Sequence, residues 1–381
     1  MNLIALFLSL LLQVPDPANE EHLRLAASYS AAREGLSMLV MIEGKIVFEE
    51  YPNGGAAERA HFLASGTKSF SGVMAACAVE DGLLQWDEPV ADTITEWKED
   101  PSRSKITIRH LLSLTSGLDA GSNQKTPSYS DALKSRVKTE PGRKFSYGPV
   151  PYQIFGEVMR RKLKKQDEDV MEYLQRRIFD PVGMKYSSWR KDADGNPHLP
   201  AGARLTAREW IKFGEMVRLG GGDIVESKHL RECFIPGRAN KRYGLTWWLN
   251  QEDTVQASGK GKQRLYINPE LKLVIVRQAP VQNKARFQDG EFLSRLLYGT
   301  DSKGRPAKME EPSGKPDPVH YRSKAELFIT KHDKDEDGNL SKDELPPSLT
   351  KNFEKVDFNG DGLVSVEELS KALASRDRSP R

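Results

Sequence analysis

The chain of 381 residues lacks the features that mark several specialised classes of protein. It has only two cysteines, Cys77 and Cys233, which lie far apart and outside any C-x-x-C pair. This excludes a disulfide scaffold and a thiolate zinc site. Neither charge dominates, because 57 Lys and Arg residues are balanced by 54 Asp and Glu residues, for a net charge of +3. We therefore expect a globular protein with no nucleic-acid partner.

Long hydrophobic runs are also missing, apart from the ten residues Leu3–Leu12. That run is too short to cross a bilayer but fits the apolar part of a secretory signal. No Lys or Arg precedes it and no A-x-A site follows it, so a short buried helix is the alternative. We expect residues 1–18 to be a signal peptide, the protein to be exported (periplasmic or secreted), and the mature chain to have no membrane span.

Strand patterns lie at both ends of the first 300 residues, with a helix-rich region between them. This order indicates an α+β protein in which both termini contribute to one mixed sheet and the helical region is inserted. The pattern predicts a hairpin from two strands, a helical region, three later strands and a closing helix: Ser37–Ile42, Lys45–Glu49, 62–220, Tyr243–Asn250, Arg264–Ile267, Leu271–Arg277 and Gly290–Tyr298.

The composition changes after residue 300 to Asp, Ser, Lys, Gly, Pro and Glu, which is typical of a linker. We place one domain at 19–300, the linker at 301–321 and a small all-α module at 322–376. Within that module the pattern Asp333–Leu345 is repeated at Asp357–Leu369. The repeats fall into two loops of twelve residues, each with Asp or Asn at positions 1, 3 and 5 and a glycine at position 6.

Each repeat has the oxygen ligands that a calcium loop needs at positions 1, 3, 5, 7 and 12. The first loop offers Asp333, Asp335, Asp337, the Asn339 carbonyl and Glu344; the second offers Asp357, Asn359, Asp361, the Leu363 carbonyl and Glu368. The pair resembles EF-hand proteins, which implies two calcium ions. Pro346-Pro347 excludes a long helix between the loops. The spacing of the loops is therefore closer to that of dockerins than to that of calcium sensors with a long connecting helix. We expect a structural module or a docking module that binds a protein partner, and a short β-bridge between Leu340 and Val364.

The common hydrolase, zincin and NTPase motifs G-x-S-x-G, H-E-x-x-H and G-x-x-x-x-G-K-[ST] are absent. The pattern S-x-x-K occurs six times, and only the copy at Ser65 has an unusual setting. Lys68 is the only Lys, Arg, Asp or Glu between Arg59 and Glu80, and an apolar helix follows it. Burial there would lower the pKa of this lysine. Ser65 lies one helical turn earlier and is the candidate nucleophile; an N-cap serine beside a snorkelling lysine is the alternative.

The surrounding sequence resembles the serine β-lactamase and penicillin-binding-protein superfamily, in particular its class C β-lactamase and β-lactamase-like esterase branch. The matching stretches follow the family's order and extend from Phe62 to Val276: FLASGTKSF, DGLLQWDEPV, ITIRHLLSLTSGL, PGRKFSYGPVPYQIFGEV, PVGM, ARLTAREWIKFGEM, YGLTWW and ASGKGKQRLYINPELKLVIV.

The resemblance implies a serine hydrolase that needs no cofactor for catalysis and acts on a small-molecule or peptide-like substrate. Ser65 would be acylated, with Lys68 as its general base and Tyr147 as the tyrosine that passes the proton to the leaving group. Ala257, Ser258 and Gly259 occupy the place of the family's K-T-G strand. The backbone N–H of Lys260 would complete an oxyanion hole with that of Ser65.

Two departures from the family pattern concern substrate binding. Pro149 stands where the family usually has the Asn of Y-x-N, and Ala257 stands where β-lactamases have the Lys of K-T-G. Lys260 or Lys262 could supply a cation from the same strand. Both losses disfavour penicillin hydrolysis and fit an esterase, amidase or peptidase. The alternative is a catalytically inactive binding protein of the same fold, docked by its calcium module.

Overall fold

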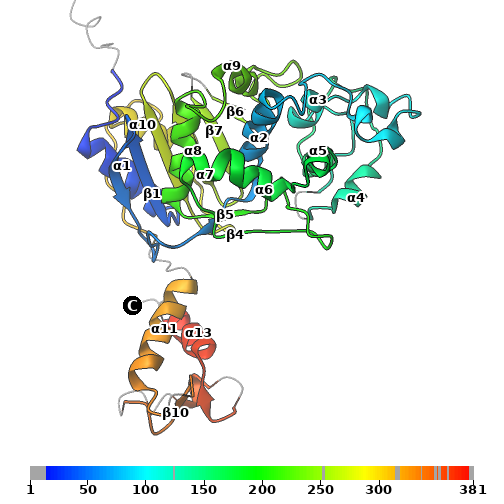
Figure 1. Ribbon diagram of the computed structural model, residues 1–381. Coiled ribbons are helices and arrows are strands. Elements are labelled where there is room, and N and C mark those ends of the chain that lie inside the picture. Colours follow the sequence, from blue (N-terminus) through cyan, green and yellow to red (C-terminus); the bar gives the residue numbers. More distant parts are fainter. Residues whose placement is uncertain are drawn as a thin grey trace, which may run out of the picture.

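The computed structural model describes residues 14–122, 125–250, 254–313, 318–335, 337–346, 350, 353–357 and 360–376 (Figure 1). The apolar run of the expected signal peptide lies outside these residues. Within the described part of the chain, no helix is both long and apolar enough to cross a membrane.

A sheet of six strands forms the centre of the larger body, in the order β2-β1-β9-β8-β7-β6 (Figure 1). Every neighbouring pair of strands in it is antiparallel, so the sheet is not mixed as expected. Strand β1 pairs with β9 from Ser37↔Gln278 to Ile42↔Leu273, so the two ends of this body meet in the sheet, as expected. The strands are β1 Ser37–Ile42, β2 Lys45–Glu50, β6 Trp248–Leu249, β7 Val255–Gly259, β8 Gln263–Asn268 and β9 Leu273–Gln278.

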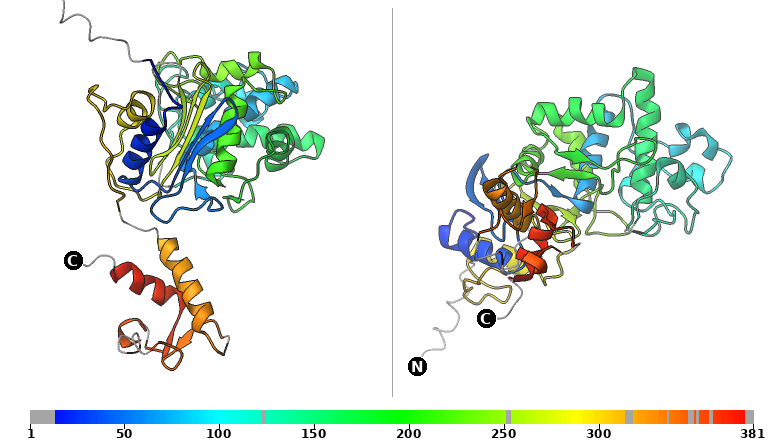
Figure 2. Two further views of the ribbon diagram at one scale, coloured as in Figure 1. Left: turned by 90° about the vertical axis from the view of Figure 1, so that its left-hand side faces the viewer. Right: turned by 90° about the horizontal axis from the view of Figure 1, so that it is seen from below.

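Alternate residues of the strands pack into two different cores, one on each face of the sheet. On β1, Met38 and Val40 join the core beneath α1 (Glu20–Ala31) and α10 (Asp289–Tyr298). Leu39 and Met41 join the larger core on the opposite face. Figure 2 shows the resulting layers, with α1 and α10 on one side of the sheet and α8 (Ala207–Arg218) on the other.

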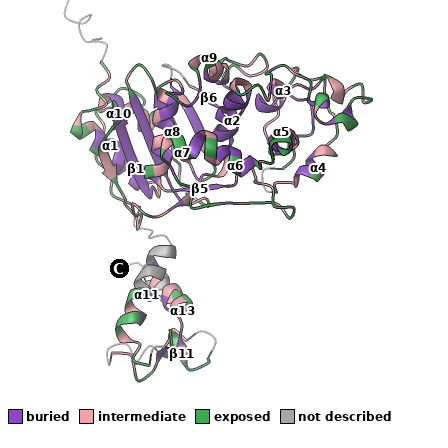
Figure 3. Ribbon diagram, in the orientation of Figure 1, coloured by how far each residue is buried: buried purple, intermediate pink, exposed green. Residues whose placement is uncertain are grey.

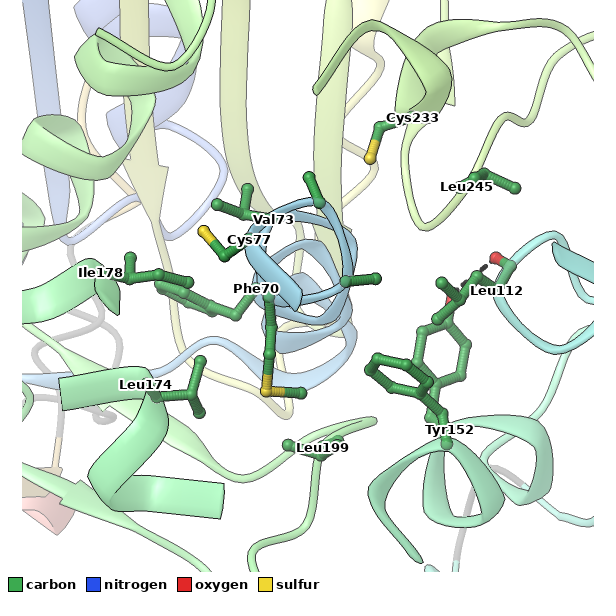
Figure 4. Close-up of a cluster of buried hydrophobic side chains, with 14 of the residues drawn as sticks. Phe70, Val73, Cys77, Leu112, Tyr152, Leu174, Ile178, Leu199, Cys233 and Leu245 are labelled. Carbon is green, nitrogen blue, oxygen red and sulfur yellow. Dashed lines mark hydrogen bonds between the residues drawn. The ribbon is translucent and has the colours of Figure 1, made fainter. Parts of the chain in front are cut away.

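The inserted region is helical, as the sequence indicates. Its helices besides α8 are α2 Lys68–Glu80, α3 Ile108–Leu112, α4 Tyr129–Leu133, α5 Val150–Leu163, α6 Val170–Leu174 and α7 Asp180–Val182, and α9 Ser227–Arg231 follows α8. Helix α2 is buried over most of its length, as Figure 3 shows in purple. Figure 4 shows Phe70, Val73 and Cys77 of this helix among the apolar side chains that enclose it.

Two parts of this body differ from the sequence interpretation. A second sheet of three short strands, β3 (His61–Phe62), β5 (Ala203–Leu205) and β4 (Ser188–Trp189), was not expected. The strand expected at Tyr243–Asn250 shrinks to β6, because the chain turns back on itself first. Thr246 adopts a left-handed φ of 75°, and the Gly244 N–H donates to the Trp247 carbonyl.

The start of the expected linker is bound to the larger body instead of being free. The Glu310 N–H donates to Ser28, its carboxylate pairs with Arg33 and Arg295, and the Ser313 N–H donates to the Ala31 carbonyl. We call residues 299–313 the strap. Backbone and charged groups make these contacts, and such groups leave no hydrophobic pattern in the sequence.

The C-terminal residues form a small body with a core of its own. Helix α11 (Pro318–His332) packs against α13 (Val366–Arg376), and Ala325, Ile329 and Leu369 are among the buried residues between them (Figure 1). Strands β10 (Leu340–Ser341) and β11 (Leu363–Val364) pair with Leu340 opposite Val364, which confirms the expected bridge between the two loops.

Candidate active site

Ser65 lies on a short 3-10 helix, η1 (Ala64–Thr67), that leads directly into α2. Ala64 adopts a left-handed φ of 47°, a conformation that costs free energy for a residue other than glycine. Thr67 Oγ1 holds the turn, because it donates to the Ala64 carbonyl and accepts from the Ala203 N–H. The strained turn presents the half-buried Ser65 at the start of α2, where backbone N–H groups favour negative charge.

Lys68 is buried and aimed at Ser65. Its Nζ donates to Ser65 Oγ over 2.9 Å and to the Pro200 carbonyl over 3.0 Å. The amine also lies 4.9 Å from the centre of the Tyr147 ring and 5.4 Å from that of Tyr152. Burial lowers the pKa of Lys68 to about 7, so a large share of the amine is neutral near physiological pH.

Tyr147 completes the group from the loop before α5. The Ser146 N–H donates to the Leu114 carbonyl, which fixes this loop against the helical region. Burial raises the pKa of Tyr147, while a hydrogen bond with Ser65 opposes that rise. The structure thus brings together the three residues that the resemblance implied: Ser65, Lys68 and Tyr147.

Two contacts of these three residues, with Trp248 and with the Pro200 carbonyl, were not predicted from the sequence. The ring of Trp248 stacks on Tyr147, with centres 5.8 Å apart and planes 29° apart. Trp247 is fully buried in the core, whereas Trp248 is half-buried beside the site. Neither the sequence around Trp248 nor that around Pro200 marks these two contacts.

Strand β7 lies directly against η1 and contains the Ala257-Ser258-Gly259 stretch. A Cβ atom on Gly259 would lie 2.0 Å from the Leu63 carbonyl oxygen, so glycine permits this close approach. Ala257 is buried in the larger core, Ser258 is half-buried, and Lys260 follows with an exposed side chain. Pro149 accepts from the N–H groups of Tyr152 and Gln153 at the start of α5.

We expect Gly259→Ala to reduce activity by separating β7 from η1. Leu63 O is a backbone atom and cannot rotate away, so the turn that holds Ser65 must move. A displacement of about 1 Å at a reacting group costs roughly 100-fold in rate. Gly290→Ala in α10 is the matched control, because its new Cβ meets nothing within 4 Å. Hydrolysis of a nitrophenyl ester measures the effect, and full activity of Gly259→Ala would contradict it.

The first C-terminal loop brings three carboxylates together. Oxygens of Asp333, Asp335 and Asp337 lie within 4.8 Å of one another. Oδ1 of Asp333 is buried and has no hydrogen-bond partner. Although the Asp337 N–H lowers it, slight desolvation of this exposed side chain and the charges of Asp337 and Glu344 raise the pKa of Asp335 above its usual range. Such a set of oxygens fits a hard divalent cation such as calcium.

The second loop repeats the internal hydrogen bonds of the first. The Gly362 N–H donates to Asp357 as the Gly338 N–H donates to Asp333. Glu368 accepts from Ser365 as Glu344 accepts from Ser341. Asn339 and Leu363 are in place at position 7 of each loop and Asp361 at position 5 of the second, whereas Asn359 lies outside the described residues.

Comparison with known proteins gives low identities over much of the chain. Protein flp of Staphylococcus aureus is 20% identical over 267 residues, 58% of this chain and 53% of that protein. Lovastatin esterase of Penicillium rubens is 28% identical over 203 residues, 43% of this chain and 47% of that protein. The chain thus spans about half the length of these curated relatives.

Solved structures share the fold. A family VIII carboxylesterase superposes with a TM-score of 0.60 at 18% identity, covering 74% of this chain and 97% of that one. A penicillin-binding-protein homologue from Caulobacter crescentus gives 0.59 at 16% identity, covering 73% and 96%. The family model described as Beta-lactamase matches residues 22–296, a range that includes Ser65, Lys68, Tyr147 and β7. This chain belongs to the beta-lactamase family.

Proposed function

We propose that the protein is a serine hydrolase that cleaves uncharged esters or amides through an acyl-Ser65 intermediate. The observation that carries the proposal is the 2.9 Å contact between Ser65 Oγ and an amine whose pKa burial lowers to about 7. A serine hydroxyl is a poor nucleophile without an adjacent base. The buried lysine supplies that base, and the family membership supports the same chemistry.

The geometry supports the following order of proton movements. Neutral Lys68 accepts the Ser65 proton as Oγ bonds to the substrate carbonyl carbon, and the N–H groups of Ser65 and Lys260 stabilise the oxyanion. The proton then passes through Tyr147 to the leaving alcohol or amine as its bond to carbon breaks. Water attacks the acyl group in the same way, and its proton returns to Ser65 as the ester bond to Oγ breaks.

The walls of the site favour a substrate without a carboxylate. Ala257 is buried among apolar side chains, and Pro149 offers only its carbonyl to α5, so neither position presents a cation or an amide. The stacked rings of Tyr147 and Trp248 offer an apolar surface beside the nucleophile. Two of the proteins compared above, lovastatin esterase and the family VIII carboxylesterase, are esterases by name.

The direct test is hydrolysis of 4-nitrophenyl butyrate, with a chromogenic cephalosporin measured in parallel. We expect Ser65-dependent turnover of the ester and little or none of the cephalosporin, because its carboxylate finds no cation at Ala257. A fluorophosphonate label should attach to Ser65 of the wild type. If neither turnover nor labelling is found, the protein is the inactive binding protein of the same fold.

We further propose that the two C-terminal loops bind one calcium ion each, as in an EF-hand pair. The support comes from the clustered carboxylates of Asp333, Asp335 and Asp337, the unpartnered buried oxygen of Asp333, and the matched hydrogen bonds of the two loops. Bound cations would relieve the repulsion among these groups. We also propose that this module binds a protein partner and that residues 1–18 direct the export of the protein.

We expect calcium to raise the melting temperature of the module and to leave ester hydrolysis unchanged. Ligand at 100 times its dissociation constant stabilises a folded module by about 2.7 kcal/mol. Titration calorimetry should find two sites in the full chain and one in Asp333→Asn. Asp343→Asn, an exposed residue at a non-ligand position, is the matched control. Calcium binding that survives in Asp333→Asn with unchanged stoichiometry would contradict the assignment.

A further inference from the structure

The Lys68 amine must carry a positive charge once it has taken the Ser65 proton. Its Nζ donates to Ser65 Oγ over 2.9 Å and to the Pro200 carbonyl over 3.0 Å. An ammonium has three N–H donors, so these two oxygens do not satisfy it. The Lys68 side chain is only 2% exposed, and burial of an unpaired charge is costly. The charged form therefore needs a further partner that water does not supply.

Two aromatic rings face this amine. Nζ lies 4.9 Å from the centre of the Tyr147 ring and 5.4 Å from the centre of the Tyr152 ring. The face of an aromatic ring is negative and attracts a cation within about 6 Å, most strongly when both groups are removed from water. Tyr147 also hydrogen-bonds to Ser65, whereas Tyr152 makes no such bond in the described part of the chain. Tyr152 thus faces the base without contacting the nucleophile through a hydrogen bond.

The position of the Tyr152 ring is fixed from both ends. At its base, the Tyr152 N–H donates to the Pro149 carbonyl at the start of α5. At its tip, the hydroxyl donates to the Leu112 carbonyl over 3.4 Å and lies 2.8 Å from the Tyr243 hydroxyl. The side chain is fully buried, and Figure 4 shows it extending from α5 toward Leu112. The ring cannot turn away from Lys68 without breaking these contacts.

No charged side chain among the described residues competes with the two rings for the amine. Burial is the cause of the lowered pKa of Lys68, and no neighbouring charge contributes. The ionisable groups that face it are Tyr147 and Tyr152, while η1, β7 and the backbone at Pro200 add none. Burial raises the pKa of Tyr152 well above its ordinary value, so this phenol stays uncharged. The charged groups packed against the rest of α2 pair with one another: Arg177 with Glu80 and Asp81, and Glu232 with Arg109.

We propose that Tyr152 is a positioning residue for the general base, and that its ring face stabilises the ammonium that forms when Lys68 accepts the Ser65 proton. The inference rests on the proposed hydrolase function and deepens it. Burial alone favours the neutral amine, which frees the lone pair but makes Lys68 a weaker base. The ring restores part of the basicity, whereas a carboxylate in its place would hold Lys68 charged and unable to accept a proton.

The test compares Tyr152→Phe with Tyr152→Leu, with 4-nitrophenyl butyrate as substrate from pH 5 to 9. Both variants lack the hydroxyl, and only phenylalanine keeps the ring face. The midpoint of the rise in kcat/KM with pH should stay at the wild-type value in Tyr152→Phe and fall by about one pH unit in Tyr152→Leu. The ratio of kcat/KM at pH 6 to that at pH 9 should then rise about fivefold in Tyr152→Leu. A general loss of structure lowers both rates and leaves their ratio unchanged.

A second substitution separates the charge distribution of the ring from its shape. Trifluorophenylalanine at position 152 has nearly the shape of phenylalanine but a much weaker negative face. The midpoint should therefore lie below that of Tyr152→Phe even though the packing is kept. An NMR titration of carbon-13-labelled lysine side chains, in which Lys68→Met identifies the Lys68 signal, should give the same order of pKa values without any turnover.

Equal midpoints in Tyr152→Phe and Tyr152→Leu, by kinetics and by NMR, would overturn the inference while leaving the hydrolase function intact. A wild type with no Ser65-dependent turnover would overturn both the function and the role of Tyr152 in it, even where the NMR titration finds an effect of the ring on Lys68.

Discussion

Ser65→Ala is expected to lower ester turnover by about 10⁴-fold or more, as removal of a nucleophile does in other serine hydrolases. No other hydroxyl among the described residues hydrogen-bonds to the Lys68 amine, so the attacking oxygen has no substitute. The substitution removes one half-buried atom and leaves the Thr67 contacts that hold η1. Circular dichroism and the melting temperature should therefore remain close to those of the wild type.

Ser188→Ala is the matched control for this experiment. Ser188 also begins an S-x-x-K sequence, but it is exposed on β4. Its replacement should leave turnover unchanged. Undiminished hydrolysis by Ser65→Ala would remove the acyl-serine mechanism, and equal losses in both variants would point to a general loss of structure.

Lys68→Met is expected to lower turnover by about 10²–10⁴-fold, the usual contribution of a general base. Methionine fills a similar volume but cannot accept the Ser65 proton. In the wild type, kcat/KM should rise with pH through about 7, because the amine must be neutral to act and its pKa lies there. A rate that stays constant from pH 5 to 9, or a fully active Lys68→Met, would contradict the role of Lys68.

The burial of Lys68 also predicts how the stability of the folded protein changes with pH. In the folded state burial lowers its pKa from 10.5 to about 7, so between these values the unfolded chain binds more protons. The stability of the wild type should therefore rise with pH between about 7 and 10.5. Below pH 7 the buried amine is charged and destabilises the folded state most. Lys68→Met should melt several degrees higher than the wild type at pH 7, with the difference shrinking toward pH 10.5.

The parts of the site that could be predicted are those marked by a pattern within one short segment of the sequence. Lys68 stands alone among uncharged residues from Arg59 to Glu80, and the structure places it inside the core. The pairing of Leu340 with Val364 followed from their equal positions in two repeats. Both inferences needed only neighbouring residues and a regular spacing.

Contacts between distant segments with no pattern of their own could not be predicted. Strands of two or three residues, such as β3 and β5, are too short to show alternation. The Pro200 carbonyl that holds Lys68 is a backbone group, which any residue would offer. The pairing of Arg264 with Asp289 joins a strand to a helix 25 residues away, and no local rule selects that partner.

The strap limits where the C-terminal module can act. Ser313 is bound at the end of α1, and α11 begins only five residues later, a reach of at most about 18 Å even when fully extended. A ligand held by the module is therefore tethered near the α1 side of the sheet, at an effective concentration that short tethers raise to about the millimolar range. Even a weak interaction between such a ligand and that surface would be nearly saturated, although the same two molecules would scarcely associate when free in solution.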